Sequence, residues 1–266
     1  DDEIDSNAGA VYVFSDLASD DTGYVRITGE HSNDYFGTRM ASGDLNGDGY
    51  DDLLVSAPDY DTDSFNVGAV YAFYGPISGD MSAASADLVV TGAVAYDDYG
   101  AQVVAAYDYN SDGFDDIIVG GTGADDNGML SGILGIHTDA MSGDTWEDAS
   151  ATVVGAAELD AAGRSFSPVS DLDGDGNNDL FFGAYGADTA YVVYGPNTGS
   201  ISAGDADFSI AGESTDSTGS AVASGDFDND GYIDLITGSS SNNSSSGAVH
   251  LFYGPCLLYT SPSPRD

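Results

Sequence analysis

The sequence predicts an all-β fold, a β-propeller whose blades are four-stranded antiparallel sheets. Three observations lead to this prediction. An Asp-rich string recurs at intervals of 55 to 64 residues, two further landmarks recur with it in constant order, and short runs rich in Val, Tyr, Phe and Ile lie between them. A fixed period with several landmarks is typical of repeat architectures, and four short strands per repeat favour propeller blades. A two-sheet sandwich is the alternative, but it predicts no repeating sequence.

The first complete repeat shows its four strands most clearly. We expect them over residues 36–42, 52–57, 68–74 and 87–92, separated by turns of Gly, Asp, Ser, Asn and Pro. No convincing helical period is visible, and the nearest string, SAASADL at 82–88, is too short for a helix. The landmarks divide the chain into units near residues 8–29, 30–92, 93–155, 156–212 and 213–255. The first unit holds two strands of an earlier blade and the last lacks its fourth strand, so about four and a half blades are expected.

The final string, CLLYTSPSPRD at residues 256–266, continues none of these landmarks. It resembles translated sequencing-adapter sequence, so we expect a non-native tail and a natural protein that continues past Pro255. The single cysteine, Cys256, lies in this string. The repeats therefore use neither disulfides nor thiolate chemistry.

The charge of the chain excludes several classes of partner. The formal net charge is −42, with four arginines and no lysine, while 41% hydrophobic residues provide enough apolar material for a core. Nucleic acids and anionic membrane surfaces both require a cationic face, so neither is an expected partner, and no apolar run is long enough for membrane insertion. Such an acidic excess must be neutralised by bound cations or screened by salt, which indicates an extracellular, secreted or cell-surface location.

Each Asp-rich string follows one rule: Asp, any, Asp or Asn, any, Asp, Gly, any, any, Asp. Oxygen ligands at alternate positions, a Gly that turns the chain and a later carboxylate form the oxygen cage that Ca²⁺ requires. An EF-hand begins similarly, but it needs a Glu at position 12 between two helices. Position 12 is here Val55, Val119, Phe182 or Thr237. Magnesium also takes oxygen ligands, but a cage of many carboxylates suits calcium better, and a solvated acidic turn is the remaining alternative.

The rule predicts up to four Ca²⁺ sites, each with four side-chain ligands and one backbone carbonyl. The expected side-chain ligands are Asp44, Asn46, Asp48 and Asp52 in the first loop, Asp108, Asn110, Asp112 and Asp116 in the second, Asp171, Asp173, Asp175 and Asp179 in the third, and Asp226, Asp228, Asp230 and Asp234 in the fourth. The expected carbonyl ligands are those of Tyr50, Phe114, Asn177 and Tyr232.

Three strings of the first complete repeat, FG at 36–37, DLNGDGYDDLLVSAP at 44–58 and GAVYAFYG at 68–75, resemble the FG-GAP repeat of the integrin α-subunit propeller and its bacterial relatives. The resemblance covers essentially residues 8–255, although FG becomes YG, AG or TG in later repeats. It implies a seven-bladed ring with calcium between the first and second strands of a blade, and ligand recognition on the opposite face. We therefore expect this chain to be a fragment of such a ring.

No catalytic constellation remains once the carboxylates are assigned to metal. The histidines His31, His137 and His250 occupy non-equivalent places, the first two in expected loops and the third in an expected strand, and no nucleophile or phosphate-binding motif is present. We therefore expect no enzymatic activity. Trp146 is a candidate sugar-stacking residue, with a buried or capping aromatic as the alternative.

Variable loops on a rigid scaffold usually carry binding. Here they are residues 59–67, 122–130 and 239–246, expected on the face opposite the calcium loops, with plain solvated connectors as the alternative. The sequence thus predicts a non-catalytic, calcium-binding extracellular propeller for adhesion or recognition of a protein or polysaccharide ligand. The alternative function is a non-catalytic propeller module of a larger secreted hydrolase or lyase.

Overall fold

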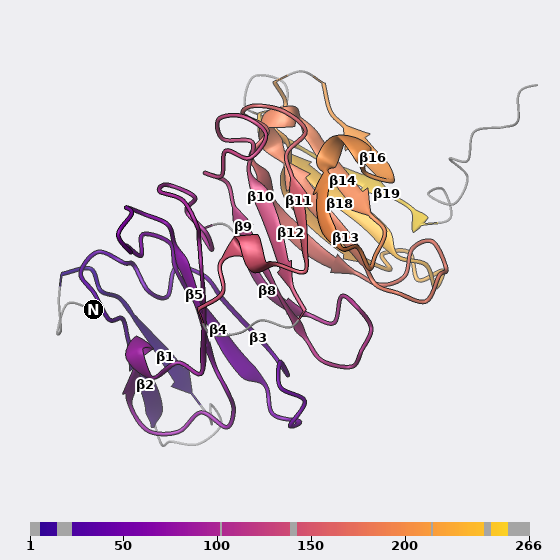
Figure 1. Ribbon diagram of the computed structural model, residues 1–266. Coiled ribbons are helices and arrows are strands. Elements are labelled where there is room, and N and C mark those ends of the chain that lie inside the picture. The colour runs from indigo at the N-terminus through magenta and orange to yellow at the C-terminus, as the bar shows by residue number, and fades with distance from the viewer. Residues whose placement is uncertain are drawn as a thin grey trace, which may run out of the picture.

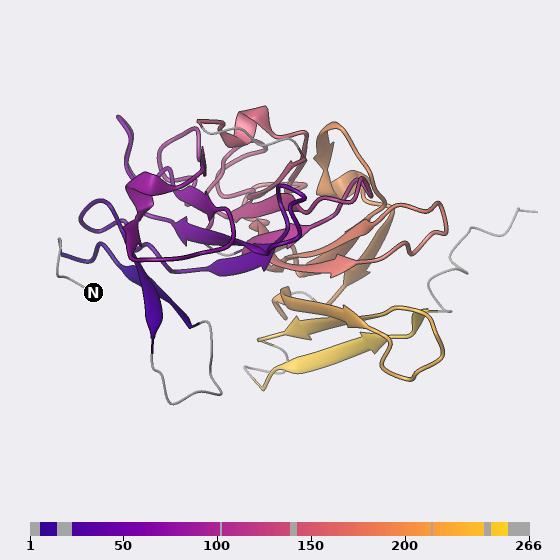
Figure 2. The ribbon, with the colours of Figure 1, turned by 90° about the horizontal axis from the view of Figure 1, so that it is seen from below.

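The computed structural model describes residues 6–14, 23–101, 103–138, 143–213, 215–241 and 246–254. These residues form five β-sheets that follow one another in chain order (Figure 1). Viewed from below, the sheets succeed one another along an arc from the indigo first sheet to the yellow last one (Figure 2). The predicted all-β propeller fold is confirmed, whereas the number of blades in a complete ring stays an expectation. The string at residues 256–266 lies outside the described residues.

Except for β6 and β15, the strands are distributed over the sheets as the repeats predict. The first sheet contains β1 (Ala10–Phe14), β2 (Tyr24–Thr28) and β6 (Met81–Ser82). The second contains β3 (Met40–Gly43), β4 (Asp52–Ala57), β5 (Ala69–Phe73) and β7 (Leu88–Thr91). The third contains β8 (Val103–Tyr107), β9 (Asp116–Gly121), β10 (Ile133–His137), β11 (Ala151–Val154) and β15 (Gly199–Ser202). The fourth contains β12 (Ala162–Val169), β13 (Asp179–Ala184), β14 (Thr189–Val193) and β16 (Phe208–Ala211), and the fifth β17 (Thr218–Gly225), β18 (Asp234–Ser239) and β19 (Ala248–Phe252).

Within each blade, consecutive strands are antiparallel and lie side by side. The Asp-rich loops join the first and second strands of a blade, and each loop ends where the second strand begins, at Asp52, Asp116, Asp179 or Asp234. In an antiparallel meander the loops between the second and third strands lie at the other end of the sheet. The Asp-rich loops therefore lie on the face opposite the loops between the second and third strands.

The segment between the third and fourth strands reaches back to the preceding blade, a feature that the sequence analysis missed. β6 pairs in parallel with β2, and β15 pairs in parallel with β11. In the third blade, the corresponding segment contacts the second blade through a single β-bridge between Thr145 and Thr91. In all three blades a 3-10 turn follows: η1 (Ala83–Ser85) in the string SAASADL, η2 (Trp146–Asp148) and η4 (Ala203–Asp205).

The first strand of the first complete repeat is shorter than expected. It begins at Met40 rather than Phe36, because Tyr35 and Gly37 both adopt positive φ angles, 54° and 95°, that end extended structure. Phe36 instead bridges to Gly9 of the preceding sheet. In the two later repeats the first strand runs over eight residues, with a register shift near its beginning.

The hydrophobic core lies between the blades. One buried cluster joins Ile118 and Leu134 of the third sheet to Leu180 and Phe182 of the fourth. Another joins Leu54 and neighbours of the second sheet to residues of the third. Each sheet thus buries its faces against adjacent sheets, which is how repeat proteins obtain their stability.

Candidate metal centre

The first residue of every Asp-rich loop organises the backbone of that loop. In the first loop Asp44 accepts hydrogen bonds from the backbone N–H of Asp48, 3.1 Å from Oδ1, and of Gly49, 2.9 Å from Oδ2. The N–H of Tyr50 donates in turn to Asp48 Oδ1 at 2.9 Å. The same three bonds recur in the loops that begin at Asp108, Asp171 and Asp226.

Two positions in each loop adopt left-handed backbone. The Gly at position six does so in all four loops, with φ between 84° and 96°. Position four is Gly47, Gly174, Asn229 or Ser111, and its φ is also positive in every loop, 58° at Ser111. Glycine and asparagine adopt this conformation readily, whereas a serine is strained there. The sequence pattern therefore specifies a loop whose side-chain oxygens turn toward one another.

The ninth residue is a buried anchor, with an exposed fraction of 1% or less in every loop. Its Oδ2 accepts the N–H of the second loop residue, at 2.9 Å between Asp52 and Leu45. Its Oδ1 accepts the N–H of a glycine just after the third strand in three blades, as from Gly75 to Asp52 at 2.7 Å. Burial raises the pKa of Asp52, and it raises the pKa of Asp179 to about 6, with backbone hydrogen bonds opposing it.

The second loop departs from this arrangement. In that blade residue 139, an Asp, stands in sequence where the other blades have the glycine. The Oδ1 atom of Asp116 is buried and has no hydrogen-bond partner among the described residues. Burial raises the pKa of Asp116 to about 7, although the N–H groups of Tyr109 and Asn110 lower it. In the other blades this atom faces the glycine after the third strand, and residue 139 lies outside the described residues.

In the third and fourth loops three carboxylates converge. One oxygen from each of Asp171, Asp173 and Asp175 lies within 4.8 Å of the others, and so do oxygens of Asp226, Asp228 and Asp234. Desolvation raises the pKa of Asp228, and repulsion by Asp230 and Asp234 adds to it. The ligand atoms of these clusters are all carboxylate oxygens. Such a set of ligands fits a hard cation such as Ca²⁺. The assignment of all twenty ligands stays a prediction, including the four backbone carbonyls.

Neighbouring loops contact one another across the blade boundary. The Oδ2 atom of Asp115 accepts the N–H of Asp44 at 2.9 Å, and the Asp115 N–H donates to the Asp44 carbonyl at 3.0 Å. The ring of Phe114 lies against Gly47, where a Cβ would come within 2.0 Å of it. Asn178, at the eighth position of the third loop, donates to the carbonyl of Asp108 at 2.6 Å. The polar eighth residues Asp115 and Asn178 were the sequence signal for these contacts.

The opposite face contains a second set of repeated carboxylates that the sequence analysis did not single out. They lie in the turns between blades, three residues before a glycine of positive φ, and all are buried: Asp34, Asp97, Asp160 and Asp216. Residues on both sides of each have positive φ. Burial raises the pKa of Asp34 to about 6, although His31 lowers it. The recurring Asp before FG, YG, AG or TG was the available signal.

Exposed apolar side chains surround these turns. Phe65 and Met129 lie in the two loops 59–67 and 122–130, and Tyr96 and Leu159 lie in the turns between blades. The backbones meet, since the N–H of Tyr96 donates to the carbonyl of Phe65 and that of Leu159 to the carbonyl of Met129, each at 2.9 Å. Of the third loop, residues 242–245 lie outside the described residues.

The three histidines and Trp146 occupy different environments. His31 is an exposed loop residue and His250 lies in β19, as predicted. The loop placement of His137 was wrong, because this residue ends β10 and is buried, with its Nε2 2.8 Å from the Tyr99 hydroxyl. Trp146 begins η2 and is half-buried.

Two stretches of the chain match known sequence families: residues 36–73 match the FG-GAP repeat, and residues 171–237 match the FG-GAP-like repeat. Both stretches contain a complete Asp-rich loop and the strand that follows it. The chain is an FG-GAP β-propeller.

This FG-GAP propeller is similar to parts of much longer proteins. It is 31% identical to integrin alpha-5 of Xenopus laevis over 183 residues, which is 64% of this chain and 16% of that protein. It is 34% identical to human integrin alpha-IIb over 174 residues, 63% of this chain and 16% of that protein. A phosphatidylinositol-glycan-specific phospholipase D of Dictyostelium discoideum is 30% identical over 182 residues, 61% of this chain and 19% of that protein. The chain thus spans less than a fifth of these relatives. Among the described residues, no helix has the length and apolarity needed to cross a membrane.

Proposed function

We propose that this FG-GAP propeller is a calcium-binding extracellular module for adhesion or ligand recognition, and that it is not an enzyme. The observation that carries the proposal is the repeated loop geometry. Four loops at the same place of four blades share the same three bonds between backbone N–H groups and carboxylates. Similarity to integrin α-subunits supports an extracellular recognition role.

In each loop the residues at positions one, three, five and nine would hold the cation, together with the carbonyl of position seven. Bound Ca²⁺ would offset two of the three or four negative charges of carboxylates that otherwise repel one another. It would also join the first strand of a blade to the second through the buried ninth residue. Because binding to the folded state stabilises it, the metal has a structural role here.

We propose that ligand recognition uses the face opposite the calcium loops. Exposed Phe65, Tyr96, Met129 and Leu159 offer apolar contact area there, on loops that hydrogen-bond to one another. Exposed aromatic and apolar side chains on rigid loops are typical of protein-binding surfaces.

The absence of enzymatic activity follows from how the titratable groups are used. In this proposal the carboxylates of the Asp-rich loops are metal ligands. The inter-blade carboxylates are buried in turns. Burial lowers the pKa of His137 to about 4, so this imidazole is neutral and enclosed. Similarity to the phospholipase D favours the second candidate function, a non-catalytic propeller module within a larger secreted enzyme.

Isothermal titration calorimetry of the calcium-free chain with Ca²⁺ tests the proposal. We expect up to four sites, with a preference over Mg²⁺, because an all-protein cage of carboxylates suits the larger ion. The matched variants are Asp175→Ala, which removes a predicted ligand, and Asp188→Ala, which changes a carboxylate outside the loops. A titration that finds no calcium site, or equal loss in both variants, contradicts the proposal.

A further inference from the structure

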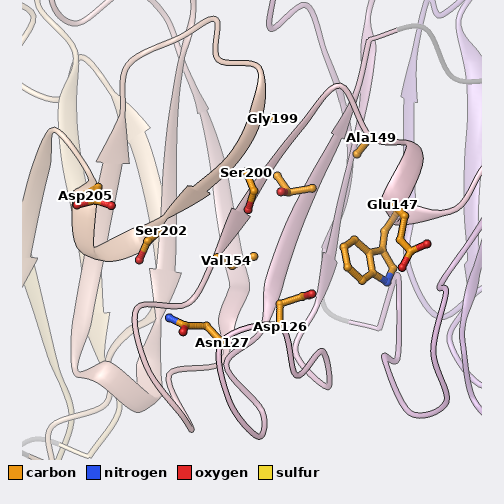
Figure 3. Close-up of a pocket in the computed structure, with 11 residues that line it drawn as sticks. Asp126, Asn127, Glu147, Ala149, Val154, Gly199, Ser200, Ser202 and Asp205 are labelled. Carbon is orange, nitrogen blue, oxygen red and sulfur yellow. The ribbon is translucent and has the colours of Figure 1, made fainter.

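A groove of about 710 Å³ lies on the outer side of the third sheet, away from the metal loops. Thr152 and Val154 of β11 line it. Figure 3 shows Asp126 and Asn127 on one side of the groove, Ser200, Ser202 and Asp205 on another, and Glu147 on the 3-10 turn η2. The volume is within the range of about 300–1,000 Å³ that is common for ligand sites.

The aromatic residue of this groove is not required by the blade. Trp146 begins η2, and the residues that begin the corresponding turns η1 and η4 are Ala83 and Ala203, each 1% exposed. Two other blades therefore complete the same turn with a small buried side chain. Trp146 instead packs partly against the core of the second and third sheets and also lines the groove.

The indole ring is held in a fixed orientation. Its Nε1 donates a hydrogen bond to Oδ2 of Asp97 at 2.8 Å. Asp97 is buried in the turn between the second and third blades, and the same oxygen accepts the N–H groups of Ala93 and Val94, at 3.1 and 2.8 Å. A ring fixed before a ligand arrives loses little conformational entropy on binding.

The charged groups of the groove are all hydrogen-bond acceptors. Asp126, Glu147 and Asp205 line it, and no Lys or Arg is among its described lining residues. Ionised carboxylates can only accept hydrogen bonds, so a ligand must supply donors. An anionic ligand is disfavoured by repulsion. Sites for ammonium groups usually enclose the cation with several aromatic rings, whereas this groove is open and has one.

We propose that this groove binds a neutral saccharide. One sugar ring stacks on the indole of Trp146, and its hydroxyls donate to Asp126 and Glu147. An aromatic surface bordered by carboxylates and hydroxyls matches a sugar ring, which has apolar C–H faces and an equatorial rim of hydroxyl donors. The site is separate from the calcium loops. It shares the loop 122–130 with the ligand face proposed above, but the exposed apolar residues of that face do not line the groove, so its failure leaves both of those proposals standing.

Trp146 is the single tryptophan of the chain, so its fluorescence reports on the groove directly. The probes are laminarin, galactan and mannan as neutral glycans, chitosan oligosaccharides as cationic ones and polygalacturonate as an anionic one. We expect a saturable change in emission with at least one neutral glycan, insensitive to added salt, and none with polygalacturonate. A response to chitosan alone that salt abolishes would assign a cation site and overturn the proposal.

Affinity electrophoresis in gels that contain the glycan extends the test to variants without the reporter. Trp146→Ala should lose roughly tenfold or more in affinity, as for the truncation of an aromatic anchor. Ser200→Phe should cause a similar loss by filling the groove from an exposed position, with the fold and Trp146 intact. Tyr12→Ala, which removes an exposed aromatic outside the groove, should bind as the wild type does. Unchanged binding in Ser200→Phe, or no retardation by any neutral glycan, contradicts the proposal.

Discussion

Asp115 receives the backbone N–H of Asp44 on its Oδ2 atom at 2.9 Å, although the two residues are 71 positions apart and belong to different blades. A second hydrogen bond joins the same two residues, because the Asp115 N–H donates to the Asp44 carbonyl. A Cβ on Gly43 would lie 2.2 Å from the same carboxylate oxygen, so Asp115 is closely fitted to the first loop. Asp44 organises the backbone of the first Asp-rich loop. The contact between the second and third blades therefore helps to fix the conformation of that loop.

Replacing Asp115 by alanine should therefore weaken calcium binding in the loop of Asp44. A lost hydrogen bond to a charged acceptor costs about 1.5–3 kcal/mol, and solvent that reaches this half-buried site reduces the loss. We expect roughly a tenfold lower affinity at one site, with the other sites unchanged, measured by calorimetric titration. The matched control is Asp51→Ala, the same loop position one blade earlier. An equal effect in both variants would show that only net charge matters.

The four metal loops should differ in strength. The loops of Asp171 and Asp226 offer four carboxylates each, whereas those of Asp44 and Asp108 have Asn at position three and offer three. Ligand charge tunes calcium affinity. The loop of Asp108 also has Ser111 in a left-handed conformation. The expected order is Asp171 and Asp226 first, then Asp44, then Asp108. Site-specific loss in Asp48→Ala, Asp112→Ala, Asp175→Ala and Asp230→Ala would assign the sites, and a different order would contradict the charge argument.

Backbone strain at the fourth loop position can be tested with a reciprocal pair. Ser111→Gly should strengthen calcium binding by about two- to fivefold, because it removes the cost of a left-handed non-glycine residue from the ordered loop. Gly174→Ser should weaken the loop of Asp171 by a similar factor. A Cβ at Gly174 meets no atom within 4 Å, so this substitution adds strain without a clash. Affinities from terbium luminescence that change in neither variant would rule out strain as the cause.

The conformation of the Asp-rich loops could be predicted from the sequence because their residues are contiguous, whereas their metal ligands stay a prediction. Gly47, Gly49 and the alternating carboxylates act within nine residues, so local backbone preferences determine the geometry. The loops' position between the first and second strands was predicted for the same reason. The polar residue at position 115 was visible in the sequence, but its pairing with Asp44 could not be predicted, since it depends on how two blades pack. The parallel additions β6 and β15 were missed because a two-residue or four-residue strand carries no period of its own.

The misplacement of His137 has a different cause. Its strand, ILGIH, is the weakest copy of its landmark and is followed by Asp139 instead of the usual Gly-Pro. Its burial comes from tertiary packing, which places its Nε2 against the hydroxyl of fully buried Tyr99. The buried inter-blade carboxylates were overlooked because the residues around Asp97 and Asp160 differ in every repeat. Only the distance to the following glycine is constant.

The buried His137 should make stability depend on pH. Burial lowers the pKa of His137 from 6.5 to about 4. The unfolded chain therefore binds a proton that the folded chain does not between pH 6.5 and 4, so this group contributes full stability above pH 6.5 and loses it as pH falls. The slope is at most about 1.4 kcal/mol per pH unit. Urea unfolding in saturating calcium should show a smaller loss on acidification in His137→Gln than in wild type. The raised pKa values of buried carboxylates act in the opposite direction, but they are common to both proteins. His250→Gln is the control, and an equal slope in all three would contradict the assignment.

Removal of calcium should destabilise the propeller through the loops themselves. Without metal each loop brings three or four carboxylates together, and the ninth residue stays buried at the start of a central strand. A site held at one hundred times its dissociation constant contributes about 2.7 kcal/mol, so excess chelator should lower the thermal midpoint clearly. The effect should be smaller in a variant that has already lost a strong site, such as Asp175→Ala, than in Asp112→Ala, whose loop is expected to be the weakest. Differential scanning calorimetry with and without chelator measures both. If chelator leaves the thermal midpoint of the wild type unchanged, the hydrophobic cores between the blades alone stabilise the propeller. The loops are then solvated acidic turns.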